Sequence, residues 1–260
     1  MRVVELLGIP GSGKSTVSSH LIKELNREQL NAMSLPQAVS SALSRGVGDR
    51  WVDPLLRLTP SSIRLRFADR LFFRSKASFQ YLAAFLQQHP EVAGAVFSAQ
   101  ARRADHEMRP DLVIGWFLHM MARYQLATST LEPDTVLVMD EGFVQRSVLL
   151  FGHRFGVSDH DDADRYVAGI PEPTLLIRLV VSPQIASQRL LADGRTATRR
   201  LDGNTNDNMR FLNDADACCA YVADRAREAG LTVIEVDASG ELDELLAATS
   251  AETIRGLRHD

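Results

Sequence analysis

The residues Gly8–Thr16, GIPGSGKST, have the composition and spacing of a loop that binds phosphate groups. Gly8, Gly13, Lys14 and Ser15 fit the pattern G-x-x-x-x-G-K-[ST]. Glycines let the backbone curve so that successive N–H groups point at phosphate oxygens, and the helix that follows presents its positive end. We expect Lys14 to reach the β- and γ-phosphates of a nucleotide and the Ser15 hydroxyl to ligate Mg²⁺. The residues expected to bind the nucleotide here are Gly11, Ser12, Gly13, Lys14, Ser15 and Thr16.

Two adjacent carboxylates, Asp140 and Glu141, follow the apolar run Val136–Met139. A desolvated carboxylate needs a compensating cation or donor, and the metal of a bound nucleotide is one such cation. We expect Asp140 to hold Mg²⁺ with Ser15, directly or through water. Glu141 has two candidate tasks, as general base toward an acceptor hydroxyl or as the anchor of an ion pair. A carboxylate at a helix start, favoured by the helix dipole, is the simpler alternative.

A cluster of arginines follows a helix that the sequence predicts to end at Gly194. Negative charge spreads over the equatorial oxygens during phosphoryl transfer, and mobile arginines that close over the site can neutralise it. We interpret residues 194–210, approximately, as a lid that contains Arg195, Arg199 and Arg200. Arg195 and Arg199 are catalytic candidates, and Arg195 is also a candidate nucleotide ligand. A solvated basic loop is the alternative.

Arg66, Arg70 and Arg74 recur at a spacing of four residues. On a helix they would share one face, where they could clamp an anionic acceptor or form an ordinary solvated face. The candidate acceptor-binding residues of the whole chain are Glu141, Arg146, Arg70, Arg74 and Arg123.

These residues need a scaffold, and the chain alternates strand-like apolar runs with helical patterns. The strand-like runs are Arg2–Gly8, Thr135–Asp140, Thr174–Val181 and Leu231–Asp237, with a weaker one at Asn31–Leu35. Such alternation predicts an α/β fold with right-handed crossovers and a parallel sheet covered by helices on both faces. A strand before Gly8 and a helix after Lys14 also disfavour an ordinary glycine-rich turn there.

Between Thr59 and Leu131 the pattern changes to several helices. Pro60, Pro90 and Pro110 stand where prolines of a first helical turn are typical. We interpret residues 55–131, approximately, as a helical insertion on the acceptor side of one domain that spans residues 1–260.

Composition narrows the class of partner. The chain has 260 residues, 45% of them hydrophobic, and a formal net charge of -4, which argues against a general nucleic-acid binder. Its cysteines, Cys218 and Cys219, are adjacent, so we expect no disulfide framework and a cytoplasmic location. We expect no signal peptide, and the apolar stretch Leu112–Met121 is too short to span a membrane.

Several of these segments together resemble the thymidylate kinase branch of the P-loop nucleoside and nucleotide kinases. MDEGFVQRSVLLFG is similar to the segment that begins D-R-Y in thymidylate kinases, and LLIRLVVSPQIASQRLLADGR to the strand, helix and arginine lid. LTVIEVDASGELDEL is similar to the last strand and the loop near adenine, which implies that Asp237, Ala238 and Ser239 contact the nucleotide. The resemblance implies a three-layer P-loop NTPase fold, with five strands in the order 2-3-1-4-5. It also implies Mg-ATP as donor and a small acceptor under the helical region.

Two departures from that family bear on the acceptor. The T-R-E-P-G-G-T-like stretch is replaced by Asn31–Leu43, NAMSLPQAVSSAL, and the arginine of D-R-Y by Glu141. A carboxylate at this place would repel a monophosphate by about 1 to 4 kcal/mol. We therefore predict an ATP-dependent kinase that phosphorylates a hydroxyl group of a nucleoside, a sugar or a similar metabolite.

Two other functions stay open. A nucleoside-monophosphate kinase could use Arg70, Arg74, Arg123 or Arg146 in place of the missing clamp. A regulatory ATPase, in which nucleotide binding or hydrolysis drives a partner interaction, belongs to another class. A homodimer is also left open.

Overall fold

The computed structural model describes residues 1–47, 59–102, 110–152, 155–156, 160–195 and 205–259. Within these residues, five parallel strands form one sheet in the order β2-β3-β1-β4-β5. The strands are β1 (Arg2–Leu7), β2 (Ala32–Ser34), β3 (Val136–Met139), β4 (Leu175–Val180) and β5 (Val233–Asp237). The predicted fold class and strand order are confirmed.

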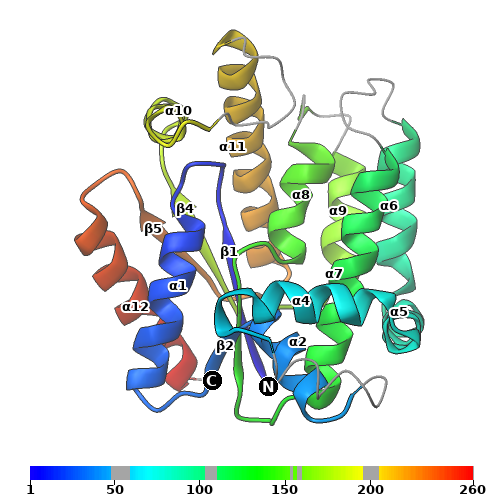
Figure 1. Ribbon diagram of the computed structural model, residues 1–260. Coiled ribbons are helices and arrows are strands. Elements are labelled where there is room, and N and C mark those ends of the chain that lie inside the picture. Colours follow the sequence, from blue (N-terminus) through cyan, green and yellow to red (C-terminus); the bar gives the residue numbers. More distant parts are fainter. Residues whose placement is uncertain (48–58, 103–109, 153–154, 157–159, 196–204, 260) are drawn as a thin grey trace.

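Helices form the outer layers. They are α1 (Lys14–Arg27), α2 (Leu35–Ser44), α4 (Ser61–Arg74), α5 (Lys76–Gln88), α6 (Pro90–Arg102), α7 (Pro110–Thr130), α8 (Phe143–Phe151), α9 (His160–Gly169), α10 (Pro183–Ala192), α11 (Thr205–Glu228) and α12 (Leu242–His259). α1 and α12 pack together on one face of the sheet, and α8 and α11 pack together on the other (Figure 1). No helix of the described residues is long and apolar enough to cross a membrane.

Local sequence signals explain where several of the helices begin. α6 and α7 begin at Pro90 and Pro110, and Pro60 directly precedes α4. The weak strand predicted at Asn31–Leu35 is present as β2, whereas the sequence did not predict α2 directly after it. Its start is explained by a capping box, in which the Ser34 side chain accepts from the backbone N–H of Gln37 and the Gln37 side chain accepts from the Ser34 N–H.

The helices between β2 and β3 have a small core of their own. It consists of Val39, Ala42, Leu43, Ala68, Phe72, Ala122 and Leu126, from α2, α4 and α7. Other side chains of this region, such as Phe85, Val96 and Phe117, belong to the main core around the sheet. The helical layer is therefore anchored to the sheet, while its role as an acceptor-side insertion within one domain stays a prediction.

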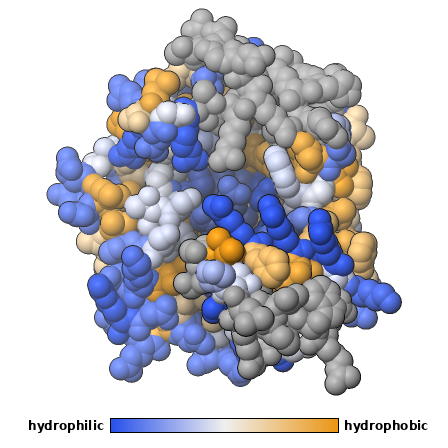
Figure 2. Space-filling view, in the orientation of Figure 1, coloured by the Kyte–Doolittle hydropathy of each residue, from blue (hydrophilic) through white to orange (hydrophobic). Residues whose placement is uncertain are grey.

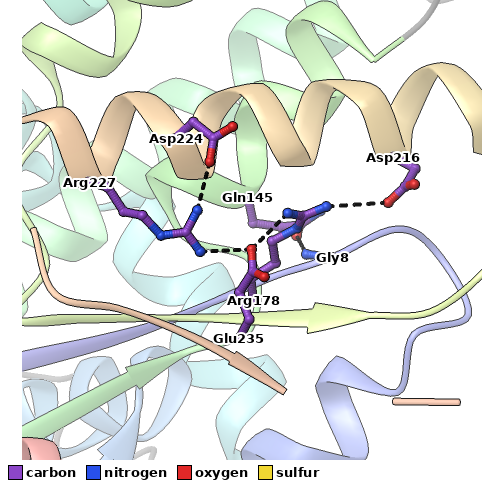
Figure 3. A network of polar contacts seen from close by, with 7 residues as sticks. All are labelled: Gly8, Gln145, Arg178, Asp216, Asp224, Arg227 and Glu235. Atoms are coloured by element: carbon purple, nitrogen blue, oxygen red, sulfur yellow. Dashed lines mark hydrogen bonds and ion pairs between the residues drawn. The ribbon is translucent and has the colours of Figure 1, made fainter. Parts of the chain in front are cut away.

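A network of ion pairs ties α11 to the sheet (Figure 3). Arg178 of β4 contacts Glu235 of β5 at 2.8 Å and Asp216 of α11 at 3.7 Å. Arg227 of α11 contacts the same Glu235 at 2.7 Å and Asp224 at 2.7 Å. The Arg178 side chain is 12% exposed, so the centre of this network is largely shielded from solvent. Burial raises the pKa of Asp216, and Arg178 counteracts that rise.

Replacing Arg178 by Met should lower the free energy of unfolding by about 1 to 2 kcal/mol, because Asp216 and Glu235 lose a partly buried partner. Arg255 serves as control, because its pair with Glu252 on α12 is exposed. Arg255→Met should change the free energy by less than about 0.5 kcal/mol. Urea denaturation of both variants measures the difference, and equal effects would show that the network contributes nothing specific.

Candidate functional site

The loop between β1 and α1 needs glycine at two positions for different reasons. Gly11 has φ +84° and Gly13 has φ +93°, both in the left-handed region. A Cβ added at Gly11 would also lie 2.5 Å from the carbonyl oxygen of Ala186 in α10. Gly13 caps α1, where the first backbone N–H groups of a helix have no partner inside it. The loop therefore wraps tightly against α10 and presents the positive end of α1.

Lys14 is held inside this loop. Its Nζ donates to the carbonyl oxygens of Gly8 at 2.7 Å and Ile9 at 3.1 Å. Burial lowers the pKa of Lys14; Asp140 and Glu141 are close enough to raise it, while Arg195 lowers it. The ammonium group is thus partly desolvated and hydrogen-bonded to carbonyl oxygens. An anionic phosphate in the loop would compensate its charge.

Ser15 and Asp140 meet beside the loop. The Ser15 Oγ donates to Asp140 Oδ2 at 3.0 Å, because β1 and β3 are parallel neighbours whose carboxyl ends lie at the same edge of the sheet. A hydroxyl and a carboxylate oxygen are the ligand types that Mg²⁺ prefers. The buried Ser12 Oγ has no hydrogen-bond partner among the described residues, as expected of a hydroxyl that awaits a ligand. These donors fit a Mg-nucleotide.

Glu141 forms an ion pair, which is one of the alternative roles that the sequence allowed for it. Arg146 of α8 donates to Glu141 Oε2 at 3.1 Å, and the side chains are 13% and 68% exposed. Burial lowers the pKa of Arg146, whereas Glu141 raises it. The charge of Glu141 is therefore compensated locally, so repulsion of an anionic acceptor by this carboxylate is weaker than the sequence alone suggested.

The other candidate acceptor arginines divide into two groups. Arg123 of α7 contacts Asp69 of α4 at 3.1 Å and lies near enough to Arg146 to lower its pKa. Arg70 and Arg74 are exposed on α4, and neither pairs with another described residue. Figure 2 shows a hollow in this face of the molecule, with hydrophilic side chains along the side of α4 that borders it. The structure thus brings Glu141, Arg146 and Arg123 together, and Arg70 and Arg74 are exposed on α4.

The loop Asp237–Ser239 lies at the same edge of the sheet as the phosphate loop (Figure 1). The N–H of Ala238 donates to the carbonyl of Val180 at 2.7 Å, and its own carbonyl accepts from Arg189 at 2.8 Å. Ser239 donates its N–H and its hydroxyl to Asp237, and both bonds lower the pKa of that carboxyl group. The loop is therefore well ordered by local bonds.

The lid arginines are described only in part. Arg195 is exposed three residues after the end of α10, and its charge lowers the pKa of Lys14 in the phosphate loop. Arg199 and Arg200 lie outside the described residues. The lid as a whole stays a prediction.

Glu5 and Gln145 also belong to the site, and the sequence predicted a role for neither of them. Gln145 of α8 accepts from the N–H of Gly8 through Oε1 at 2.9 Å and donates its own N–H to Glu5 at 2.9 Å. Glu5 is only 1% exposed. A charged residue inside the apolar run RVVELL was the available signal for Glu5, whereas nothing in the local sequence distinguishes Gln145.

Replacing Gly11 by Ala should weaken binding of Mg-ATP by more than about tenfold, or 1.4 kcal/mol, because the collision with Ala186 must move the loop. Gly230 is the matched control, since it has φ +90° and open space around it. Gly230→Ala should lower the free energy of unfolding by about 1 to 2 kcal/mol and leave binding unchanged. Calorimetric titration and urea denaturation measure both effects. Unchanged binding in Gly11→Ala would mean that this loop does not hold the nucleotide.

Comparison with known proteins gives matches at the level of structure. No family model matches this chain, and no curated protein matches its sequence. A structure of deoxyadenosine kinase from M. mycoides, with the products dCMP and a flexible dCDP bound, has a TM-score of 0.51 and 13% identity. The match covers 97% of this chain and 99% of that chain. A second structure of that kinase, with bound dATP, has a TM-score of 0.49 and 12% identity over the same shares of both chains. Together with the strand order, the first match shows that the chain has the P-loop kinase fold.

Proposed function

We propose that the protein transfers the γ-phosphate of Mg-ATP to a hydroxyl group of a small acceptor such as a nucleoside or a sugar. The observation that carries this proposal is the contact of 3.0 Å between the Ser15 hydroxyl and Asp140, directly beside the phosphate loop with Lys14. The fold shared with deoxyadenosine kinase supports it. The chain has two cysteines, Cys218 and Cys219, which are adjacent and buried, and this use of cysteine supports a reducing location such as the cytoplasm.

In this proposal the phosphate loop and Lys14 bind the triphosphate. Ser15 and Asp140 would hold Mg²⁺, which when bound supplies positive charge to the phosphate oxygens. Lys14 leaves its bonds to the carbonyls of Gly8 and Ile9 when phosphate oxygens offer a charged partner. Arg195, on the side of Lys14, adds positive charge to the transferred group, and Arg199 and Arg200 complete the lid.

Glu141 would act as the general base. Its carboxylate is exposed next to Asp140, and Arg146 binds it through Oε2. This ion pair orients the carboxylate of Glu141, so that Oε1 can accept the proton of an acceptor hydroxyl.

The acceptor would lie against Arg123 and Arg146. Each of these side chains keeps a buried Nε–H without a hydrogen-bond partner among the described residues. Buried donors of this kind are costly unless a ligand satisfies them, and hydroxyl or carbonyl oxygens are suitable partners. A nucleoside or a sugar carries several such oxygens, which favours these acceptors.

The test is ADP release with Mg-ATP and a panel of nucleosides, nucleoside monophosphates, sugars and aminoglycosides. We expect an uncharged hydroxyl acceptor to raise ADP release well above the background hydrolysis of ATP. Asp140→Asn should depress transfer and background hydrolysis together, because the lost charge faces the metal. Glu141→Gln should lower transfer by about 10² to 10⁴ and leave background hydrolysis within a few-fold.

Asp134→Asn, in the exposed loop before β3, is the control and should change neither rate. A preference for a monophosphate would favour the nucleoside-monophosphate kinase, with Arg70, Arg74, Arg123 or Arg146 in place of the missing clamp. A slow ATPase that no small molecule stimulates, combined with nucleotide-dependent binding of a protein, would favour the regulatory ATPase. Transfer at the wild-type rate in Glu141→Gln would remove the base from the mechanism.

A further inference from the structure

Glu5 is a buried acid in the central strand. It lies between Met139 of β3 and Leu176 of β4 in the sheet and is 1% exposed. Burial raises the pKa of its carboxyl group to about 8. An acid in this position is costly to ionise, and an apolar residue would pack there without that cost. The carboxyl group therefore needs a role that offsets its burial.

The contacts of Glu5 concentrate on the first turn of α8. Its Oε1 accepts from the N–H of Gln145 at 2.9 Å, and hydrogen bonds from the backbones of Val144 and Phe143 also lower its pKa. The first N–H groups of a helix have no partner inside the helix. Glu5 supplies that partner from a neighbouring strand, in the way that a capping side chain does from the residue before a helix.

Gly142, directly before α8, packs closely against the same carboxyl group. A Cβ at this position would lie 2.3 Å from Glu5 Cδ and 2.5 and 2.7 Å from its two oxygens. Its φ of -85° is accessible to any residue, so the requirement for glycine is steric. The glycine that follows Asp140 and Glu141 in the sequence therefore leaves room for Glu5.

Gln145 joins this contact to the phosphate loop. Its N–H donates to Glu5, while its Oε1 accepts from the N–H of Gly8 at 2.9 Å, a contact drawn in Figure 3. On the far side, the Tyr166 hydroxyl donates to the carbonyl of Phe143 at 2.8 Å. The first turn of α8 is thus held by Glu5 of β1, by Gly8 directly after β1 and by Tyr166 of α9.

We propose that Glu5 is a positioning residue that fixes the first turn of α8, and through it Glu141 and Arg146, beside the phosphate loop. This inference rests on the proposed function, because Glu141 and Arg146 are the acceptor-side residues of that proposal. The hydrogen bonds described for Glu5 come from the backbone of α8. Glu5 acts through the backbone N–H groups that it binds.

The titratable groups that face Glu5 do not change charge in the pH range in which Glu5 titrates. They are Tyr124 of α7, Tyr166 of α9 and Arg146 of α8. Burial and the charge of Glu5 raise the pKa of both tyrosines, so they stay neutral below pH 9, and Arg146 stays charged. The pKa of Glu5 rises from 4.5 to about 8 on folding. The stability that comes from its bound proton is therefore complete below pH 4.5 and is lost as the pH rises through 8.

Three variants test the proposal. Glu5→Gln keeps an acceptor for the N–H groups, Glu5→Leu removes it, and Val4→Ala removes buried volume from the adjacent residue as a control for lost stability. We expect Glu5→Leu to lower kcat about 10- to 100-fold per folded molecule and to leave the KM for ATP within about threefold. Glu5→Gln should rescue kcat to within about threefold, and Val4→Ala should keep the wild-type value per folded molecule.

Two further readouts are independent of catalysis. Hydrogen exchange at the amides of Phe143, Val144 and Gln145 should accelerate about 10- to 100-fold in Glu5→Leu and stay protected in Glu5→Gln. The stability of wild type relative to Glu5→Gln should fall as the pH rises from 5 to 9, because only wild type loses a proton.

Unchanged exchange and unchanged kcat in Glu5→Leu would overturn the proposal. An equal loss of kcat in Val4→Ala would also overturn it, because the effect would then be one of general stability. If no acceptor stimulates wild type, the proposed function fails by itself, and exchange at the three amides still decides whether Glu5 holds α8.

Discussion

The parallel pairing of β1 with β3 is the constraint on which the candidate site depends. Because Glu5 lies beside Met139, both strands reach the same edge of the sheet within a few residues of each other. β1 then continues into the phosphate loop, and β3 into Asp140. The contact between Ser15 and Asp140 follows from this register. A shift of β3 by one residue would reverse the direction of its side chains and remove the contact.

The site contains two cations, Lys14 and Arg146, whose charges are only partly compensated by the protein. Both side chains are less well solvated than an arginine or lysine on the surface, and this burial lowers the pKa of each. Lys14 bonds to backbone carbonyls, and Arg146 pairs with the carboxylate of Glu141. Triphosphate and acceptor oxygens would complete these interactions. The site therefore gains favourable electrostatic energy on binding, which a solvated surface of equal charge would not.

Features that depend on neighbouring residues in the sequence could be predicted, whereas contacts between residues of separate elements could not. The strands and the phosphate loop were predictable because periodicity and glycine spacing are local properties, and the strand order came with the family resemblance. The pairs of Arg146 with Glu141 and of Arg123 with Asp69 were not, because they join separate turns or helices whose packing the pattern does not specify. α2 was missed although Ser34 and Gln37 form a recognisable capping box. Glu5 was visible only as an unexplained charge in an apolar strand.

The most direct test of the account is calorimetric titration of Mg-ATP into wild type and Lys14→Ala. We predict that the variant binds about 10- to 100-fold more weakly, because a charge-assisted contact to the phosphates is lost. Its fold should stay intact, since among the described residues Lys14 donates to carbonyls of its own loop. Lys23→Ala, on the exposed side of α1, should bind as wild type does. Equal affinity in wild type and Lys14→Ala would contradict the assignment of this loop to the nucleotide, and with it the proposed kinase.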